Sequence, residues 1–427
     1  MNQSKISIKI RDSFWFISAV YGVVAILLAI IISIADKWLL MNFKNNLPEI
    51  LLTTNKVMID LYSSLVMGIL TMTTISFSVI MVVLTTYSTQ FSPRTLQDFM
   101  GSRATQNVLG VYCLGFILAL IHLVTAGKGP SLIGPIIMVI VAILTLAFFV
   151  YFIHHSARWI QVNNLIGKIR NDGSQVIKNT YKDYNLNGYV EWDEDELEEI
   201  QNNDKQLVYA QSSGYIQKIE WTELVKQATN QECILQVDVQ IGDFVVKGSP
   251  LMSVVETNNR NYKFNQFLII GNERTDIQDV EFMLQKLVEI ALRAISPAIN
   301  DPHTAINCLN RIGSLLSEIG ETYNENRYFT DDKKNLRVIS KPKLFDEYLY
   351  KSFYQIRHYG KEDISMLYAM IEVLYKIAVV SENSIKQKVW TFHYYIMDVI
   401  EPDSLSTLDN EHLQSICRKL KEQCAFE

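Results

Sequence analysis

Long apolar runs dominate the first 160 residues of the chain, and shorter periodic patterns replace them afterwards. The runs extend over Phe14–Ile34, Leu61–Thr86, Val108–Val124 and Leu132–His154. An α-helix needs about 20 apolar residues to cross the hydrocarbon of a bilayer, and each run meets this need, the third only just. The pattern therefore predicts a transmembrane domain of four helices over residues 1–160.

Basic residues beside these runs are unevenly distributed between the two sides that four spans create. One side holds Lys5, Lys9, Arg11, Arg94, Arg103, Arg158, Lys168 and Arg170, and the other holds Lys37, Lys44, Lys56 and Lys128. Because basic residues accumulate on the cytosolic side of membrane proteins, both termini are expected in the cytosol. The predicted location is the cell membrane, with several passes through it.

The second apolar run differs from the other three because hydroxyl side chains recur along it. Four of them are spaced by seven residues, and two more lie close to the same helical stripe. The stripe consists of Ser64, Thr71, Thr74, Ser78, Thr85 and Ser88. Small and hydroxyl residues at this spacing suit close packing and hydrogen bonds between helices. Alternatively, copies of this helix from several subunits line a water-filled path.

Ionisable residues near the membrane are few. Asp60 and Arg94 flank the hydroxyl stripe and are the candidate ends of such a path, although the sign of a permeant ion cannot be read from them. His122 lies near the end of the third run, and an ionisable group inside a span is by default a functional hypothesis. A packing role for His122 stays open.

The remaining chain changes pattern twice. Residues 161–204 read as a helical linker with an acidic segment, residues 205–270 as a small β-domain, and residues 271–427 as a mostly helical domain. Arg327–Phe329 and Leu336–Ile339 are predicted to form a hairpin within the last domain. The fold class is thus an α-helical membrane protein with a cytosolic β-domain and a mostly α-helical C-terminal domain.

The linker contains a segment that fits an EF-hand loop. Such loops place oxygen ligands at positions one, three, five, seven, nine and twelve, with glycine at position six. The corresponding residues here are Asp183, Asn185, Asn187, Tyr189, Glu191 and Glu194, with Gly188 as the glycine. The segment is either a calcium site or a plain acidic linker that starts a helix. Calcium is the one cofactor that the sequence suggests.

A further candidate lies between two predicted helices. Asn300, Asp301, Pro302 and Thr304 have the residue types that begin a helix, with aspartate as the N-cap and proline in the first turn. This capping interpretation is favoured over a ligand site.

Charge and motifs exclude several other classes. The net charge is −6 without a lysine or arginine cluster, which disfavours a nucleic-acid partner. The five cysteines are scattered without metal-ligand spacing, as expected for free thiols in a reducing compartment. No glycine-rich phosphate loop, serine nucleophile elbow or HExxH motif is present, so an enzyme is disfavoured.

Three strings together resemble a known family. Phe91–Arg94, Ser213–Ile216 and Ala294–Ala305, the last with the pattern Ser-Pro-x-x-Asn-Asp-Pro-x-Thr-Ala, are similar to a bacterial family of predicted multi-pass membrane proteins catalogued as a domain of unknown function. The resemblance implies the layout of four spans and a mixed cytosolic region. It supplies no reaction and no catalytic residues.

Two functional hypotheses follow from these observations. The first is a homo-oligomeric membrane channel or channel-like permeation protein for an inorganic ion, with its pore lined by the second helix and a cytosolic regulatory region. The second is a membrane-anchored sensor or scaffold whose cytosolic domains bind a ligand or a protein partner. The lipid bilayer is the one partner common to both.

Overall fold

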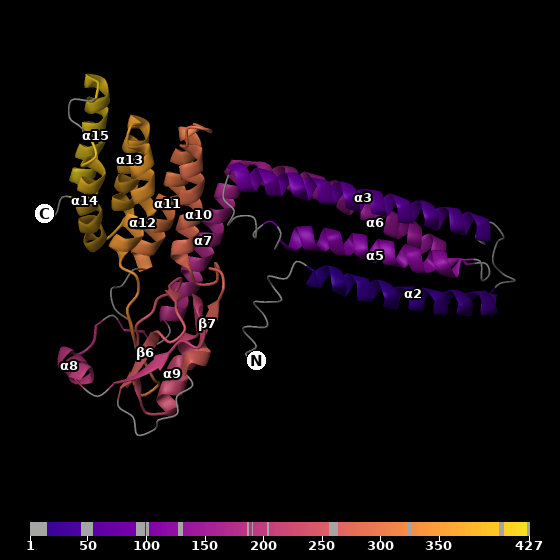
Figure 1. Cartoon of the computed structure of the whole chain (residues 1–427), viewed down its shortest axis with the longest axis horizontal. Helices are drawn as coiled ribbons and strands as arrows, with labels where there is room; N and C mark the ends of the chain where they lie inside the picture. Colours follow the sequence, from indigo (N-terminus) through magenta and orange to yellow (C-terminus); the bar gives the residue numbers. More distant parts are fainter. Residues whose placement is uncertain are drawn as a thin grey trace. The chain divides into compact units, whose positions relative to one another are not determined.

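The structure is a computed structural model, shown in Figure 1. It describes residues 15–43, 54–90, 99, 102–126, 131–185, 188–189, 191–202, 205–255, 264–322, 327–400 and 405–424. The chain divides into two compact units, Met1–Val162 and Asn163–Glu427.

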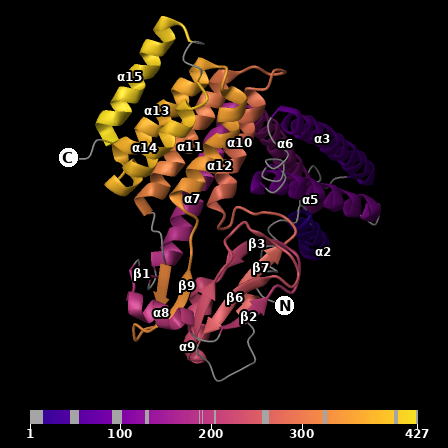
Figure 2. The same ribbon diagram turned by 60° about the vertical axis from the view of Figure 1, so that its left-hand side comes forward.

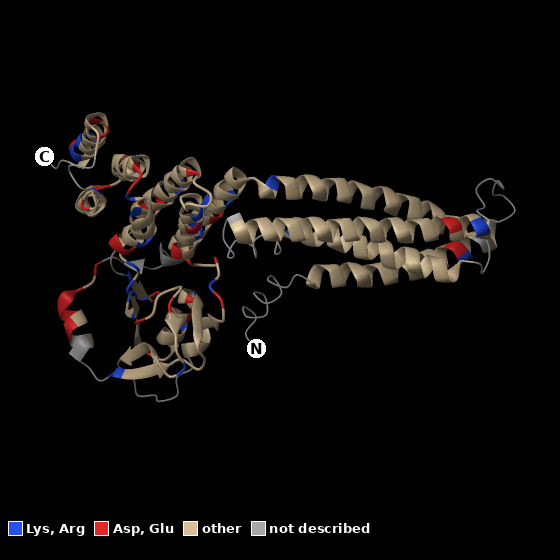
Figure 3. Ribbon diagram, turned by 45° about the horizontal axis from the view of Figure 1, so that its top comes forward, with Lys and Arg blue, Asp and Glu red and all other residues tan. Residues whose placement is uncertain are grey.

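The first unit consists of long apolar helices. Its described residues form α2 (Phe16–Phe43), α3 (Asn55–Gln90), α5 (Arg103–Thr125) and α6 (Ile133–Ile160). All four are long and apolar enough to cross a membrane. Lysine, arginine, aspartate and glutamate are confined almost entirely to the ends of these helices (Figure 3). The predicted four-helix membrane domain is confirmed.

Small residues allow α2 and α5 to approach closely. Ala25 and Ala29 of α2 belong to one buried cluster with Ala119 of α5. Gly110 of α5 lies against the ring of Tyr21, because a Cβ atom added at Gly110 would stand 2.5 Å from Tyr21 Cδ2. Lipid tails are as apolar as these side chains, so close van der Waals contact rather than the hydrophobic effect holds such helices together.

One face of α3 is buried in the unit. Tyr62, Ile69, Ser76 and Val83 recur every seven residues and are each at most 2% exposed. The Ser76 hydroxyl lies 3.2 Å from the hydroxyl of Tyr112 on α5. This face therefore packs α3 against its neighbours.

The second unit is a helical bundle joined to a region of strands (Figure 2). Its long helices are α7 (Val162–Asn185), α10 (Val280–Ala294), α11 (Pro302–Thr322), α12 (Phe345–Gly360), α13 (Ile364–Val380), α14 (Asn383–Met397) and α15 (Thr407–Cys424). The expected mostly helical C-terminal region is confirmed.

Helices α7 and α11 run parallel in a constant register. Asn307 donates to Asn163 at 2.9 Å, and the hydroxyl of Ser174 donates to Glu318 at 2.6 Å, each pair being 144 residues apart in the sequence. Arg170 adds an ion pair to Glu318 at 2.6 Å. Equal separations along both helices mean that the two helices advance together in the same direction.

The strands form two sheets with shorter helices between them. The strands are β1 (Gly188–Tyr189), β2 (Lys205–Tyr209), β3 (Gly214–Ile219), β4 (Ile234–Val237), β5 (Phe244–Val245), β6 (Pro250–Val255), β7 (Leu268–Gly271), β8 (Arg327–Thr330) and β9 (Leu336–Ser340). Three short helices accompany them: α8 (Glu194–Asn202), α9 (Trp221–Asn230) and the 3₁₀ helix η4 (Phe264–Phe267).

The larger sheet joins distant parts of the sequence. Its order is β1-β8-β9-β4-β6-β2, and the smaller sheet has the order β5-β3-β7. The predicted hairpin is present as the antiparallel pair β8 and β9, which enters the sheet because β9 pairs parallel with β4. The strand region therefore extends beyond residues 205–270. A parallel pair needs a long crossover, which a local strand pattern does not reveal.

The contact between Gly110 and Tyr21 predicts the effect of one methyl group. Gly110→Ala should lower the thermal stability of the detergent-solubilised protein by about 1–3 kcal/mol, because the new Cβ must displace a packed ring. The matched control is Gly68→Ala on α3, where an added Cβ meets no heavy atom within 4 Å. Equal melting temperatures for the two variants would contradict the described packing.

Candidate functional site

The hydroxyl stripe of α3 lies on the outward face of the helix. Four of its hydroxyls each follow a residue of the buried face of α3 by two positions, and two positions correspond to about 200° around a helix. These hydroxyls belong to Ser64, Thr71, Ser78 and Thr85. Every member of the stripe is exposed, namely Ser64, Thr71, Thr74, Ser78, Thr85 and Ser88. The described part of the chain therefore does not cover the stripe. Packing among the described residues of one copy does not explain it.

Most of these hydroxyls are already hydrogen-bonded to their own helix. Ser64 donates to the Asp60 carbonyl at 2.7 Å, and Thr71 donates to the Met67 carbonyl at 2.8 Å. The same bond to the carbonyl four residues earlier recurs at Thr74, Ser78 and Thr85. Such bonds satisfy each hydroxyl proton and leave the oxygen lone pairs available as acceptors.

The stripe is long enough to cross a bilayer. Ser64 and Ser88 are 24 positions apart. At about 1.5 Å per residue, this separation corresponds to about 36 Å. A hydrocarbon core is about 30 Å thick. The outward faces of the neighbouring helices are aliphatic instead, for example Ile30 and Ile31 of α2 and Ile140 and Leu144 of α6, all at least half exposed.

The predicted ends of a path are described only in part. Asp60 is exposed in the second turn of α3. Arg94 lies outside the described residues.

Asp36 of α2 forms a polar contact that the sequence pattern did not reveal. It is 8% exposed, and its carboxylate accepts hydrogen bonds from the backbone N–H groups of Leu132, Ile133 and Gly134 at 2.8 to 3.1 Å. The Ser131 hydroxyl donates to the same carboxylate. A carboxylate from one helix therefore caps the N-terminus of α6, where the helix dipole favours negative charge.

His122 lies on the neighbouring helix α5. Its Nδ1 is 2.9 Å from the Leu118 carbonyl, and because a carbonyl only accepts, Nδ1 carries the proton. Its Nε2 is buried without a hydrogen-bond partner among the described residues. The ring packs edge-on against Tyr62, with the ring centroids 5.7 Å apart.

The EF-hand-like segment is only partly described. The backbone of α7 is helical through Asn185, which includes Asp183, and Asn187 lies outside the described residues. Tyr189 belongs to β1, and Glu191 and Glu194 are exposed. Within the described ranges, no group of three or more His, Cys, Asp or Glu side chains is arranged to hold a metal ion. Calcium binding stays a prediction.

The residues between α10 and α11 have the geometry of a helix cap. Asp301 accepts hydrogen bonds from the Thr304 amide at 3.1 Å and the Thr304 hydroxyl at 2.6 Å, and these bonds lower the pKa of Asp301. Pro302 is the first residue of α11, and Asn300 has a φ of 51°, in the left-handed region. These contacts account for Asn300, Asp301, Pro302 and Thr304 without a ligand.

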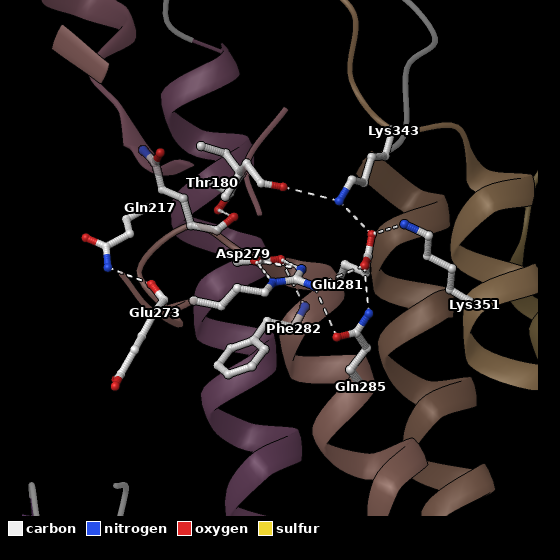
Figure 4. Close-up of polar contacts among 12 residues, drawn as sticks. Thr180, Gln217, Glu273, Asp279, Glu281, Phe282, Gln285, Lys343 and Lys351 are labelled. Atoms are coloured by element: carbon white, nitrogen blue, oxygen red, sulfur yellow. Dashed lines mark hydrogen bonds and ion pairs between the residues drawn. The ribbon is translucent and has the colours of Figure 1, made fainter. Parts of the chain in front are cut away.

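A buried charge cluster in the second unit surrounds Glu281 (Figure 4). Its carboxylate is 2.6 Å from Lys343 Nζ, 2.8 Å from Lys351 Nζ and 3.3 Å from Arg274. Glu281 is 3% exposed. Burial alone would raise its pKa, but the Lys343 ammonium beside it and the other cations lower the pKa of Glu281 to about 2.

Asp279 extends this cluster to the start of α10. Arg274 donates to both of its carboxylate oxygens at 2.8 Å. Asp279 also accepts from the Phe282 amide at 2.9 Å, which caps α10. Its deep burial nevertheless raises the pKa of Asp279. Arg274 thereby links the strand region to the first turn of the bundle.

A small cavity lies beside the cluster. It measures about 40 Å³ and is lined by residues that include Thr180, Gln240, Glu281 and Lys343. This volume has room for a few water molecules. Lys343 also donates to the Ile241 carbonyl at 3.2 Å. The cluster is therefore best explained as a network of polar contacts that holds the strand region against the helices.

The pKa of Glu281 predicts an acid-dependent loss of stability. A depressed folded-state pKa contributes stability that is present above the unfolded value near pH 4 and is lost as pH falls towards 2. At pH 7, Glu281→Gln should lower the unfolding free energy by about 3–5 kcal/mol, because it removes the ion pair of the buried Lys343 ammonium.

This difference should shrink between pH 5 and pH 3 in denaturant titrations of the wild type and the variant. Glu321→Gln, at an exposed position of α11, is the control and should have little effect. If the difference in unfolding free energy between the wild type and Glu281→Gln stayed constant over this pH range, the lowered pKa of Glu281 would be contradicted.

Comparison with known proteins identifies the family of the chain. A family model described as "Predicted membrane protein (DUF2254)" matches residues 11–376. Uncharacterised proteins of Mycobacterium bovis and Mycobacterium tuberculosis are 26% identical over 324 residues. That stretch covers 71% of this chain, and the chain spans about 60% of the length of these relatives. No solved structure matches. The expected family membership is confirmed, and the chain belongs to this family of predicted membrane proteins of unknown function.

Proposed function

We propose that the protein is a homo-oligomeric, channel-like permeation protein of the cell membrane, in which α3 of each copy faces a common axis. The observation that carries this proposal is the outward hydroxyl stripe from Ser64 to Ser88, exposed along its whole length. Oligomers usually close by rotational symmetry, which presents the same helix of every copy to the axis.

The chemistry of the stripe supports a wet environment. Each hydroxyl that donates to its own helix keeps lone pairs that accept hydrogen bonds from water. Aliphatic residues offer no such acceptors, and these fill the outward faces of α2 and α6. The exposed surface of α3 also carries apolar side chains between the hydroxyls, such as Met67 and Met81. Water would therefore line the hydroxyl stripe itself, and lipid would cover the aliphatic faces of α2 and α6.

The proposed path has no formal charge along the span. Residues 61–90 contain no lysine, arginine, aspartate or glutamate. Any charge selectivity would therefore arise at the ends of the path. The candidate residues there are Asp60, which the structure describes, and Arg94, which lies outside the described residues. The distribution of basic residues predicts that both termini are in the cytosol. The second unit would then also be cytosolic, and we propose that it regulates permeation.

A second function is favoured by exposed aromatic side chains of the second unit. Tyr350 on α12 and Tyr394 on α14 are 48% and 59% exposed, and Arg357 lies 4.1 Å from the ring centroid of Tyr395. Tyrosine and arginine are enriched where proteins bind one another. These side chains support the alternative of a membrane-anchored sensor or scaffold with a protein partner.

Single cysteines along α3 test the permeation proposal. In a Cys113→Ser, Cys417→Ser background, cysteines at Ser64, Thr71, Ser78 and Thr85 should react with a charged thiosulfonate added to the reconstituted protein. Modification at Thr71 should also reduce the current across a planar bilayer. Matched controls are cysteines at Ile140 and Leu144, exposed on the aliphatic face of α6, which should stay protected.

Two results together would contradict the proposal. One is protection of all stripe positions to the same degree as the α6 controls. The other is the absence of current over a range of salts, pH values and voltages. A scaffold would give both results and would still bind its partner through Tyr350 and Tyr394.

A further inference from the structure

The turn between α10 and α11 is held closed by its own hydrogen bonds. The Asn300 amide donates to the Ser296 carbonyl at 2.9 Å, and the Asp301 amide donates to the Ala294 carbonyl at 2.8 Å. The Ser296 hydroxyl donates to the Arg293 carbonyl at 2.6 Å. The polar residues of the turn therefore have structural roles.

At the apex of this turn only the backbone contributes, since the Ile299 amide donates to the Ser296 carbonyl at 3.0 Å, and the side chains make no hydrogen bond. Pro297, Ala298 and Ile299 are all exposed, and Ile299 is 40% exposed. A closed turn thus presents three consecutive apolar residues outward. Apolar surface is more stable in an apolar environment than in water, so contact with lipid would stabilise this apex.

The α7–α11 register locates the apex. Asn307 is level with Asn163, which is the second residue of α7. Pro302 precedes Asn307 by five residues, so it lies about 7.5 Å further along the helix axis, past the start of α7. The apex extends further in that direction. Asn163 follows Ile160, the last residue of α6, by three residues, which span at most about 10 Å. The apex is therefore at the end of the bundle that the chain reaches directly after a candidate membrane span.

The same end carries an exposed tyrosine. A Cβ atom added at Gly360, the last residue of α12, would lie 3.6 Å from Ile295 Cδ1, so the α12–α13 turn is beside the α10–α11 turn. Tyr359 on this turn is 68% exposed. Tyrosine side chains favour the boundary between water and lipid. We name this end, formed by the start of α7 and the two turns, the turn end.

We propose that the turn end rests on the surface of the bilayer that α6 spans, with the apex Pro297-Ala298-Ile299 inserted among the lipid headgroups and Tyr359 beside it. The contact would fix the height of the second unit above the membrane. The proposal rests on α6 crossing a bilayer and is independent of a permeation path along α3.

A fluorescent probe on the turn tests this contact in the full-length chain. Ile299→Cys and Ala298→Cys, each in a Cys113→Ser, Cys417→Ser background, are labelled with a nitrobenzoxadiazole dye. The protein is then placed in nanodiscs of phosphatidylcholine and phosphatidylglycerol. Cys233, Cys308 and Cys424 are buried and stay unlabelled.

The matched control is Val380→Cys, 54% exposed at the last residue of α13. It lies 16 residues, or about 24 Å, from the start of that helix at the turn end. The expected result is a blue-shifted emission at the apex that lipids with a headgroup nitroxide quench, with neither effect at Val380→Cys.

Two outcomes would overturn the proposal. Emission and quenching at both apex positions equal to those at Val380→Cys would show that the apex stays in water. A blue shift without quenching by nitroxide lipids would show that protein, from this copy or another, covers the apex.

Discussion

Hydrocarbon offers no hydrogen-bond partner, and this constraint governs where polar groups lie in the first unit. Asp36 is buried, and its carboxylate is paired with backbone N–H groups at the start of α6, which would otherwise lack partners themselves. The α3 hydroxyls satisfy their protons on their own helix. The oxygen lone pairs of these hydroxyls stay available on an outward face of α3. This row of unused acceptors motivates the proposal of a water-filled path.

The second unit depends on polar contacts between segments that are far apart in the sequence. Arg170 and Ser174 bind Glu318 across the parallel pair α7 and α11. Glu281 binds Lys343 at the junction of strands and helices. Because α7 follows α6 almost directly, the first contact ties the bundle to the segment that leaves the membrane helices.

Local patterns in the sequence were sufficient for features that depend on neighbouring residues. The four apolar helices and the Asp301 cap of α11 follow from composition and from residues three positions apart. Asp36 was missed because its partners lie almost a hundred positions away on another helix. The parallel pairing of β4 with β9 was missed for the same reason. The calcium prediction at Asp183 to Glu194 stays a prediction, since Asn187 lies outside the described residues.

In the proposed assembly, α3 of every copy faces a symmetry axis. Electron cryomicroscopy of the full-length protein in nanodiscs tests it most directly, since it reports the number of copies and the position of each helix. We expect a rotationally symmetric oligomer whose Ser64, Thr71, Ser78 and Thr85 side chains point towards the axis. A monomer, or an oligomer in which this face of α3 contacts lipid, would contradict it.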